Sequence, residues 1–148
     1  MNFEIPNLKS YPKNPFFLIA GPCIVEDEKT TFQIAKKLKS ITSQLNIPFI
    51  FKASFKKANR TRLDSFTGIG DLMALEILGR IRKELIIPVL TDIHEKEDAE
   101  LAGSFVDVLQ IPAFLCRQTE LLVSAAKTGK VINLKKGQFI SVSTLNHS

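Results

Sequence analysis

The segment from Lys52 to Arg62 holds the densest group of residues that could do chemistry. Five of its eleven residues are lysine or arginine, and no acidic residue occurs before Asp64. Serine, threonine and asparagine in the same segment add neutral polar groups. Arginine offers a planar fork of donors, lysine a point charge, and hydroxyl groups complete the shell around phosphate oxygens. The segment therefore predicts a site for a small phosphorylated substrate, and the alternative interpretation is a solvated basic loop.

A nucleic-acid site is the less favoured interpretation of these charges. Such a site needs broader basic coverage, interleaved with aromatic side chains on which bases stack. The chain has no tryptophan and one tyrosine, and its net charge of +5 is a moderate excess that suits an anionic partner. We therefore expect small phosphorylated substrates and no nucleic acid.

Other reactive side chains follow short apolar runs elsewhere in the chain. Cys23 comes after Gly21-Pro22, but a lone cysteine is more commonly a small buried thiol. No second ligand stands at a CxxC or HxxxH spacing, so the spacing alone reveals no metal site. Asp92 is either a site carboxylate or a helix cap, and His94 is either an acid–base group or a partner of a carboxylate such as Glu95. Further polar groups of this kind are Gln110 and Lys135.

The apolar runs and the segments between them predict the elements that position these side chains. The runs are too apolar for strands with one wet face, so they indicate buried parallel strands. They are residues 16–19, 49–51, 89–90, 106–109 and 131–134. Segments with a period near 3.6 separate them and predict four helices. These are residues 32–45 after an N-cap at Asp27, 71–85, 97–102 ended by Gly103, and 120–128 between an N-cap at Thr119 and a stop at Gly129.

This alternation predicts an α/β fold in which the reactive residues share one end of the sheet. Ligands bind at the carboxyl ends of parallel strands in both open α/β sheets and barrels. A flavodoxin-like sheet and a little more than half of a (β/α)8 barrel both fit five strands in 148 residues. The flavodoxin-like sheet needs a helix after its fifth strand, and the residues after Lys135 show no apolar period. We therefore favour a single barrel-type domain truncated to about five strands and four helices.

Composition excludes several other classes of protein. Apolar residues make up 45% of the chain and charged residues 24%, which is a globular balance. The longest apolar run, residues 16–20, is far shorter than a membrane span, and no secretory signal is recognisable. Two cysteines are too few for a disulfide framework, so a reduced cytoplasmic protein is expected.

Residues 16–139 resemble the 3-deoxy-D-manno-octulosonate 8-phosphate synthases. Five blocks carry the resemblance in the family's order: FFLIAGPC (16–23), KASFKKANR (52–60), TDIHE (91–95), QIPAFLCRQT (110–119) and KKGQF (135–139). The related 3-deoxy-D-arabino-heptulosonate 7-phosphate synthases share the Gly-Pro-Cys turn. They typically carry a Lys-Pro-Arg-Thr type segment where this chain has Lys-Ala-Asn-Arg, so they are the alternative assignment.

The resemblance implies a (β/α)8 barrel, usually a homotetramer, that condenses phosphoenolpyruvate with D-arabinose 5-phosphate for lipopolysaccharide synthesis. By similarity, the phosphoenolpyruvate ligands are Lys52, Lys57, Gln110 and Lys135. The arabinose 5-phosphate ligands are Asn59, Arg60 and Thr61, and Arg117 would reach the sugar phosphate of a neighbouring subunit. Asp92, Lys52 and Asn59 are the implied catalytic residues. Cys23 matches the metal-dependent branch, which makes it a ligand of a divalent ion such as iron, zinc, manganese or cobalt.

The chain departs from the family after Phe139. The family continues through an Ala-Pro-Trp-Asp type stretch, whereas residues 140–148 diverge. The family's other metal ligands, a histidine, a glutamate and an aspartate, come from later strands. We therefore predict the amino-terminal part of a metal-dependent synthase, with residues 1–15 as an extension and 140–148 as a divergent tail. Such a chain is expected to be poorly stable and inactive by itself. A non-catalytic flavodoxin-like binding module is the alternative from a different class.

Overall fold

The computed structural model describes residues 4–10, 16–59 and 61–145, which form a five-stranded parallel sheet. The strands are β1 (Leu18–Ala20), β2 (Phe49–Lys52), β3 (Val89–Asp92), β4 (Val108–Ile111) and β5 (Val131–Leu134). Their order in the sheet is the order of the chain, and all four neighbouring pairs are parallel. A barrel winds in this order, whereas a flavodoxin-like sheet has the order 2-1-3-4-5. The fold is therefore a five-strand half-barrel, and the flavodoxin-like alternative is wrong.

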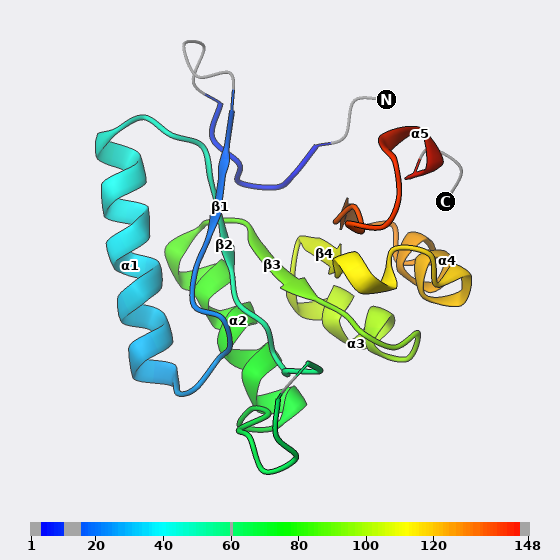
Figure 1. Ribbon diagram of the computed structural model, residues 1–148. Coiled ribbons are helices and arrows are strands. Elements are labelled where there is room, and N and C mark those ends of the chain that lie inside the picture. Colours follow the sequence, from blue (N-terminus) through cyan, green and yellow to red (C-terminus); the bar gives the residue numbers. More distant parts are fainter. Residues whose placement is uncertain (1–3, 11–15, 60, 146–148) are drawn as a thin grey trace.

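Helices alternate with the strands and follow one another around the outside of the sheet (Figure 1). They are α1 (Glu28–Gln44), α2 (Asp71–Leu85), α3 (Asp98–Phe105) and α4 (Thr119–Lys127), with the short η1 (Ala113–Leu115) and α5 (Val142–Leu145). The predicted N-cap of α1 is confirmed, because Asp27 accepts a hydrogen bond from the Thr30 amide at 2.8 Å. Among the described residues, the structure contains no helix long and apolar enough to span a membrane.

Several element boundaries differ from the prediction. The first strand begins at Leu18, and the second and third extend to Lys52 and Asp92, so polar residues end the strands instead of following them. Gly103 was predicted to end α3 but lies inside it, because the helix continues to Phe105. The position packs against the carboxyl end of α4, since a Cβ on Gly103 would lie 3.6 Å from Thr128, the residue that follows this helix. The predicted cap Thr119 is the first residue of α4, and Gln118 precedes it.

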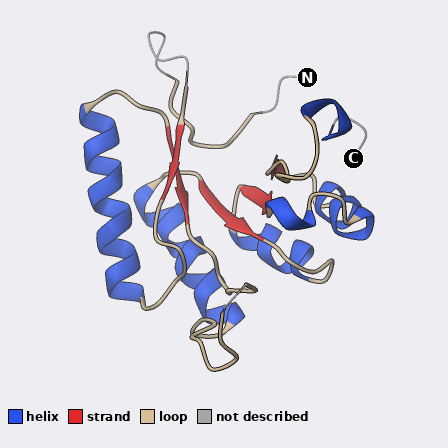
Figure 2. Ribbon diagram, viewed as in Figure 1, coloured by secondary structure: helices blue, strands red, loops and turns tan. Residues whose placement is uncertain are grey.

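The two faces of the sheet carry different neighbours. On one face, Phe51, Val89 and Leu109 pack against all four long helices in the main core. On the other, which we call the inner face, lies a smaller apolar cluster that includes residues of the amino-terminal segment. Figure 2 shows the backbone of this segment running beside the sheet. The buried members of the cluster are Ile5, Ile50, Leu90 and Val108, with Leu8, Ile19 and Val131 against them. The segment that contains Ile5 therefore covers the amino-terminal part of the inner face.

We predict that Ile86→Gly stabilises the protein by about 1 kcal/mol. Ile86 follows α2 with φ of 50°, a left-handed conformation that strains a β-branched residue. Its side chain is 64% exposed, so its removal loses little apolar burial. Urea unfolding measures the change. Ile86→Ala is the matched control, because it removes a similar part of the side chain but keeps the Cβ that causes the strain. A gain of the same size in both variants would contradict the explanation.

Candidate functional site

The inner face changes from apolar to polar along each strand towards its carboxyl end. Leu90 pairs with Val108 and Val108 with Val131, and two residues further on Asp92 pairs with Gln110 and Gln110 with Asn133. Residues two apart on a strand share a face, so these polar side chains lie directly beyond the apolar cluster. Ser54 extends the same line next to Asp92 through a hydrogen bond between their side chains. We call Ser54, Asp92, Gln110 and Asn133 the polar row.

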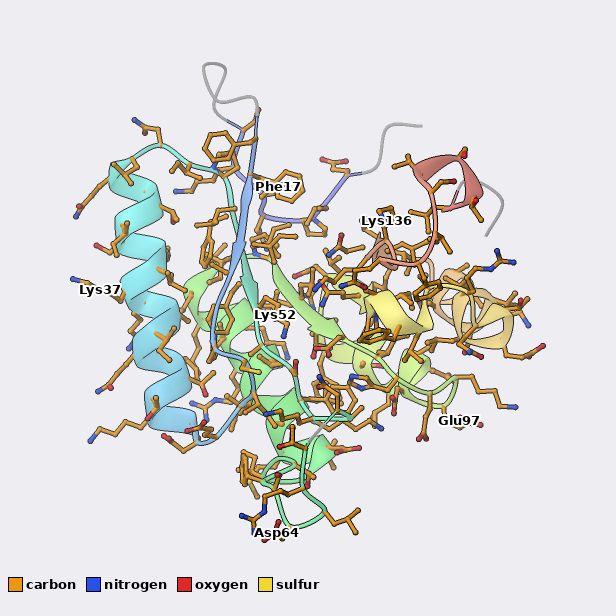
Figure 3. The ribbon with its side chains drawn as sticks, viewed as in Figure 1. Phe17, Lys37, Lys52, Asp64, Glu97 and Lys136 are labelled. Carbon is orange, nitrogen blue, oxygen red and sulfur yellow. The ribbon has the colours of Figure 1, made fainter. Side chains whose placement is uncertain are left out.

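Asp92 is the centre of a connected group of side chains from β2 and β3. The Lys52 ammonium donates to Ser54 Oγ at 2.7 Å, and the Ser54 hydroxyl donates to Asp92 Oδ1 at 2.5 Å. Lys52 Nζ also lies 3.5 Å from Asp92 Oδ1, and His94 Nε2 lies 3.1 Å from Asp92 Oδ2. Figure 3 shows Lys52 near the middle of the molecule, beside β3. Both carboxylate oxygens of Asp92 are therefore engaged.

These contacts keep Asp92 ionised although its side chain is largely buried. Burial is the largest effect and raises the pKa of Asp92, because it removes water from the charged form. The hydrogen bond from His94, the charge of Lys52 and the hydrogen bond from Ser54 together outweigh burial and lower the pKa to about 2. At neutral pH Asp92 can therefore accept hydrogen bonds and stabilise positive charge, but it cannot supply a proton.

In the other half of the polar row, Asn133 orients the side-chain amide of Gln110. Asn133 Nδ2 donates to Gln110 Oε1 at 2.8 Å. Because this bond occupies the carbonyl oxygen of Gln110, the terminal NH2 group of the same side chain is available to donate to an anion. Sequence reasoning missed Asn133, although it is a polar residue near the carboxyl end of β5 and alternation along the strand puts it on the same face as Val131.

β1 approaches β2 very closely where it ends. A Cβ on Gly21 would lie 1.9 Å from the carbonyl oxygen of Lys52, so a side chain has no room there. Two residues later, Cys23 is exposed, and its carbonyl oxygen accepts from Lys52 Nζ at 3.5 Å. Within the described ranges, however, Cys23 belongs to no group of three or more histidine, cysteine or acidic side chains able to hold a metal. These residues alone therefore do not make a metal centre.

The basic segment after β2 is divided between internal partners and open surface. Arg62 is 76% exposed and binds Asp64 at 2.7 Å at the far end of the loop (Figure 3), so for this residue the solvated-loop interpretation fits. Lys56 binds Asp98 at 2.7 Å. Lys57 is half-buried, and its amide donates to the carbonyl oxygen of Thr67 at 2.9 Å. The predicted ligands Asn59 and Thr61 are exposed, and Arg60 lies outside the described residues.

The remaining predicted ligands lie at the same end of the sheet but outside the connected group. Arg117 is exposed between η1 and α4, after β4. Lys135 is exposed directly after β5, where its amide donates to the carbonyl oxygen of Ile111 at 3.1 Å. Within the described part of the chain, no hydrogen bond or ion pair joins the side chains of Asn59, Thr61, Arg117 or Lys135 to Asp92. The structure thus brings Lys52 and Asp92 into contact and places Gln110 next to them.

His94 was left open by the sequence, and the structure shows its partner. Its imidazole binds Asp92, on the same strand end, and not Glu95. Its other ring nitrogen, Nδ1, is buried and lacks a hydrogen-bond partner among the described residues. Ser54 was part of the basic segment but was not singled out. Its place two residues after Lys52 was the available signal, because both side chains then lie on the inner face.

We predict that the stability difference between the wild type and Asp92→Asn depends on pH. A pKa lowered from 3.8 to about 2 contributes about 2 kcal/mol to folding above pH 4.5, since one pKa unit corresponds to about 1.4 kcal/mol. This contribution falls as the pH drops through the folded-state pKa and is mostly lost at pH 2. Urea unfolding at pH 7, 4 and 2 measures it. Asp64→Asn removes an exposed carboxylate as the control, and a pH-independent difference for Asp92→Asn would contradict the prediction.

We predict that Gly21→Ala destabilises the protein by about 2 kcal/mol or more, because the new methyl group meets the Lys52 carbonyl oxygen in the backbone of β2. Thermal unfolding followed by circular dichroism measures the loss. Gly103→Ala is the control, since its methyl group makes ordinary contacts inside a helix and is expected to be neutral or stabilising by up to about 1 kcal/mol. Equal stability of Gly21→Ala and wild type would show that the approach of β1 to β2 is not constrained.

Comparison with known proteins agrees with this arrangement. The family model described as "DAHP synthetase I family" matches residues 11–148. Relatives named 2-dehydro-3-deoxyphosphooctonate aldolase include that of Koribacter versatilis, 54% identical over 132 residues, which are 89% of this chain and 48% of the relative. The protein of that name from Pisum sativum is 52% identical over 135 residues, 91% of this chain and 47% of the relative. That from Bartonella quintana is 52% identical over 138 residues, 93% and 50% respectively.

The chain thus spans about half the length of the curated relatives that it matches. The predicted resemblance is confirmed, since many relatives at this level of identity carry the octulosonate name. The match of the family model over nearly the whole chain, together with the half-barrel sheet, shows that this protein belongs to the DAHP synthetase I family.

Proposed function

We propose that this chain forms part of the substrate-binding end of a 2-dehydro-3-deoxyphosphooctonate aldolase, also called 3-deoxy-D-manno-octulosonate 8-phosphate synthase. The observation that carries the proposal is the ionised Asp92 between Lys52 and Gln110 at the carboxyl ends of β2, β3 and β4. Relatives with 52–56% identity bear the aldolase name, which supports this choice within the family.

The proposed reaction joins phosphoenolpyruvate, D-arabinose 5-phosphate and water. A carbon–carbon bond forms between C3 of phosphoenolpyruvate and the aldehyde carbon of the sugar, whose oxygen takes up a proton. The oxygen of water adds to C2, and the bond between C2 and the phosphate oxygen breaks. The products are 3-deoxy-D-manno-octulosonate 8-phosphate and inorganic phosphate. Two anionic substrates must lie side by side, so a cationic strand edge lowers the cost of bringing them together.

Lys52, Gln110 and Asp92 have complementary roles in this proposal. Lys52 supplies a positive charge and Gln110 its free NH2 donor to phosphoenolpyruvate, with Lys57 and Lys135 adding charge from the adjoining segments. Asp92 remains a carboxylate at neutral pH, so it serves as an acceptor that orients water or a sugar hydroxyl beside the reacting carbons. Because its oxygens already bind Ser54 and His94, its position is fixed before the substrate arrives.

The loop after β2 is the proposed site of the sugar phosphate. Asn59 and Thr61 are exposed there and present a side-chain amide and a hydroxyl group. Arg60, between them in the sequence, belongs to the same proposal. Arg117 is proposed to serve a neighbouring subunit of a homotetramer, which fits its exposed position after β4.

Cys23 is proposed as a ligand of a divalent ion, either iron, zinc, manganese or cobalt. A thiolate suits the softer of these ions, and the exposed position next to Lys52 leaves the sulfur accessible. The described residues do not complete such a site, so we assign no step to a metal. Since the chain spans about half the length of its relatives, we expect the 148 residues alone to bind substrates without measurable phosphate release.

Isothermal titration calorimetry with phosphoenolpyruvate tests the proposal on the 148-residue chain. We expect binding by the wild type and at least about tenfold weaker binding by Lys52→Met, because a desolvated charge contact is lost. Lys96→Met is the matched control, since Lys96 is exposed and pairs with Glu97 at 3.8 Å away from the polar row. No binding by the wild type, or equal losses in both variants, would overturn the proposal.

The same titration distinguishes the two synthases of this family. D-Arabinose 5-phosphate should bind more tightly than D-erythrose 4-phosphate if the chain belongs to an octulosonate enzyme. The reverse preference would assign it to the heptulosonate enzymes. A phosphate-release assay with both substrates present tests the expected inactivity of the 148 residues, and detectable turnover would contradict it.

A further inference from the structure

Lys56 is turned away from the polar row and into a contact with α3. Its ammonium lies 2.7 Å from Asp98 Oδ1 and 3.7 Å from Asp71 Oδ2. It also lies 5.3 Å from the centre of the buried Phe55 ring. The Lys56 side chain is 23% exposed, and its ammonium is engaged by carboxylates of the protein itself.

Asp98 joins this lysine to the segment that follows β3. Its Oδ1 accepts from Lys56, while its Oδ2 accepts from the backbone amides of His94 and Glu95, each at 3.0 Å. The Asp98 side chain is 10% exposed, and its three donors come from two different loops. A single carboxylate therefore ties the loop between β2 and α2 to the loop between β3 and α3.

The electrostatics agree with a firm contact. Burial lowers the pKa of Lys56, but the hydrogen bond and charge of Asp98, with the charges of Asp71 and Glu95, raise it above its usual value. Burial likewise raises the pKa of Asp98, and the donors Lys56, His94 and Glu95 lower it below its usual value. Both groups remain charged at neutral pH, as a charge-assisted hydrogen bond requires.

The contact closes a ring of interactions around the candidate site. Lys52 at the end of β2 and Ser54 two residues beyond it reach Asp92, and Asp92 reaches the imidazole of His94. The backbone amide of His94 donates to Asp98, and Asp98 binds Lys56, which returns to the chain just beyond β2. Lys57 follows Lys56 directly and Asn59 comes two residues later, so a shift of Lys56 moves the proposed sugar-phosphate loop.

We propose that Lys56 and Asp98 are positioning residues that hold the loop bearing Lys57, Asn59 and Thr61 against the loop bearing His94. This inference rests on the proposed function. It adds that Lys56, one of the basic residues of the segment, positions the loop and does not bind the substrate itself. The ion pair sets the distance between the sugar-phosphate loop and Asp92, and with it the distance between the two substrates.

Amide hydrogen exchange tests the contact between Lys56 and Asp98 without any ligand. In Lys56→Met and in Asp98→Asn, exchange at the amides of His94 and Glu95 should accelerate about tenfold, the effect of one lost charge-assisted hydrogen bond. Lys56→Arg keeps the cation and should restore protection. The matched control is Arg62→Met, which removes a cation from the same loop whose partner Asp64 is local. Unchanged exchange in Lys56→Met, or equal acceleration in the control, would overturn the proposal.

Calorimetry with each substrate tests the positioning role. D-Arabinose 5-phosphate should bind about tenfold more weakly to Lys56→Met. The affinity for phosphoenolpyruvate should fall by a smaller factor, about threefold or less, since Lys52, Gln110 and Lys135 are untouched and only Lys57 of its proposed ligands lies on the held loop. The double variant Lys56→Met/Asp98→Asn should be no weaker than the weaker single variant, because both remove one contact. Additive losses, or an equal loss in Arg62→Met, would overturn the role. If exchange accelerates in the variants but the wild type binds no sugar phosphate, the link between the two loops is supported and the proposed function is overturned instead.

Discussion

The ionised carboxylate of Asp92 is the constraint on which the candidate site depends. A buried carboxylate is costly unless partners compensate for the lost water. Here the compensation comes from Lys52, Ser54 and His94, which belong to two neighbouring strand ends. These contacts form only if β2 and β3 keep their register. The protonation state of Asp92 therefore depends on the packing that holds the two strands in place.

Along the strands, the inner face has one region of apolar packing and a second region that carries the candidate site. Its amino-terminal part is apolar and lies under Ile5 and Leu8, whereas its carboxyl-terminal part carries the polar row. A step of two residues along a strand crosses from one region to the other because alternate side chains share a face. The helix-covered core on the opposite face fixes the strands, so the polar residues need not contribute to the apolar packing.

The basic segment from Lys52 to Arg62 shows that the number of charges alone is a poor description of a site. Lys52 compensates Asp92, Lys56 links two loops and Arg62 pairs with an exposed aspartate at the loop's far end. Lysine and arginine at neighbouring positions thus serve three purposes, which differ in burial and in the origin of the partner. The proposed phosphate site therefore uses fewer cations than the sequence of the segment suggests.

The amino-acid sequence by itself determined the alternation of strands and helices, the N-cap at Asp27 and the presence of polar residues near the carboxyl ends of the strands, because these depend on local periodicity and capping. It also carried the family resemblance in five short blocks. Tertiary structure decided the strand order that excludes a flavodoxin-like sheet, the partner of His94, the roles of Ser54, Asn133 and Asp98, and the continuation of α3 through Gly103. The strand order and the roles of Ser54, Asn133 and Asp98 depend on contacts between segments 20 or more residues apart, and the course of α3 depends on packing against the end of α4. His94 and Asp92 are close in the sequence, but their contact depends on how the chain turns after β3. Local sequence patterns carry no information about such distances, so only the folded chain could show which polar groups meet.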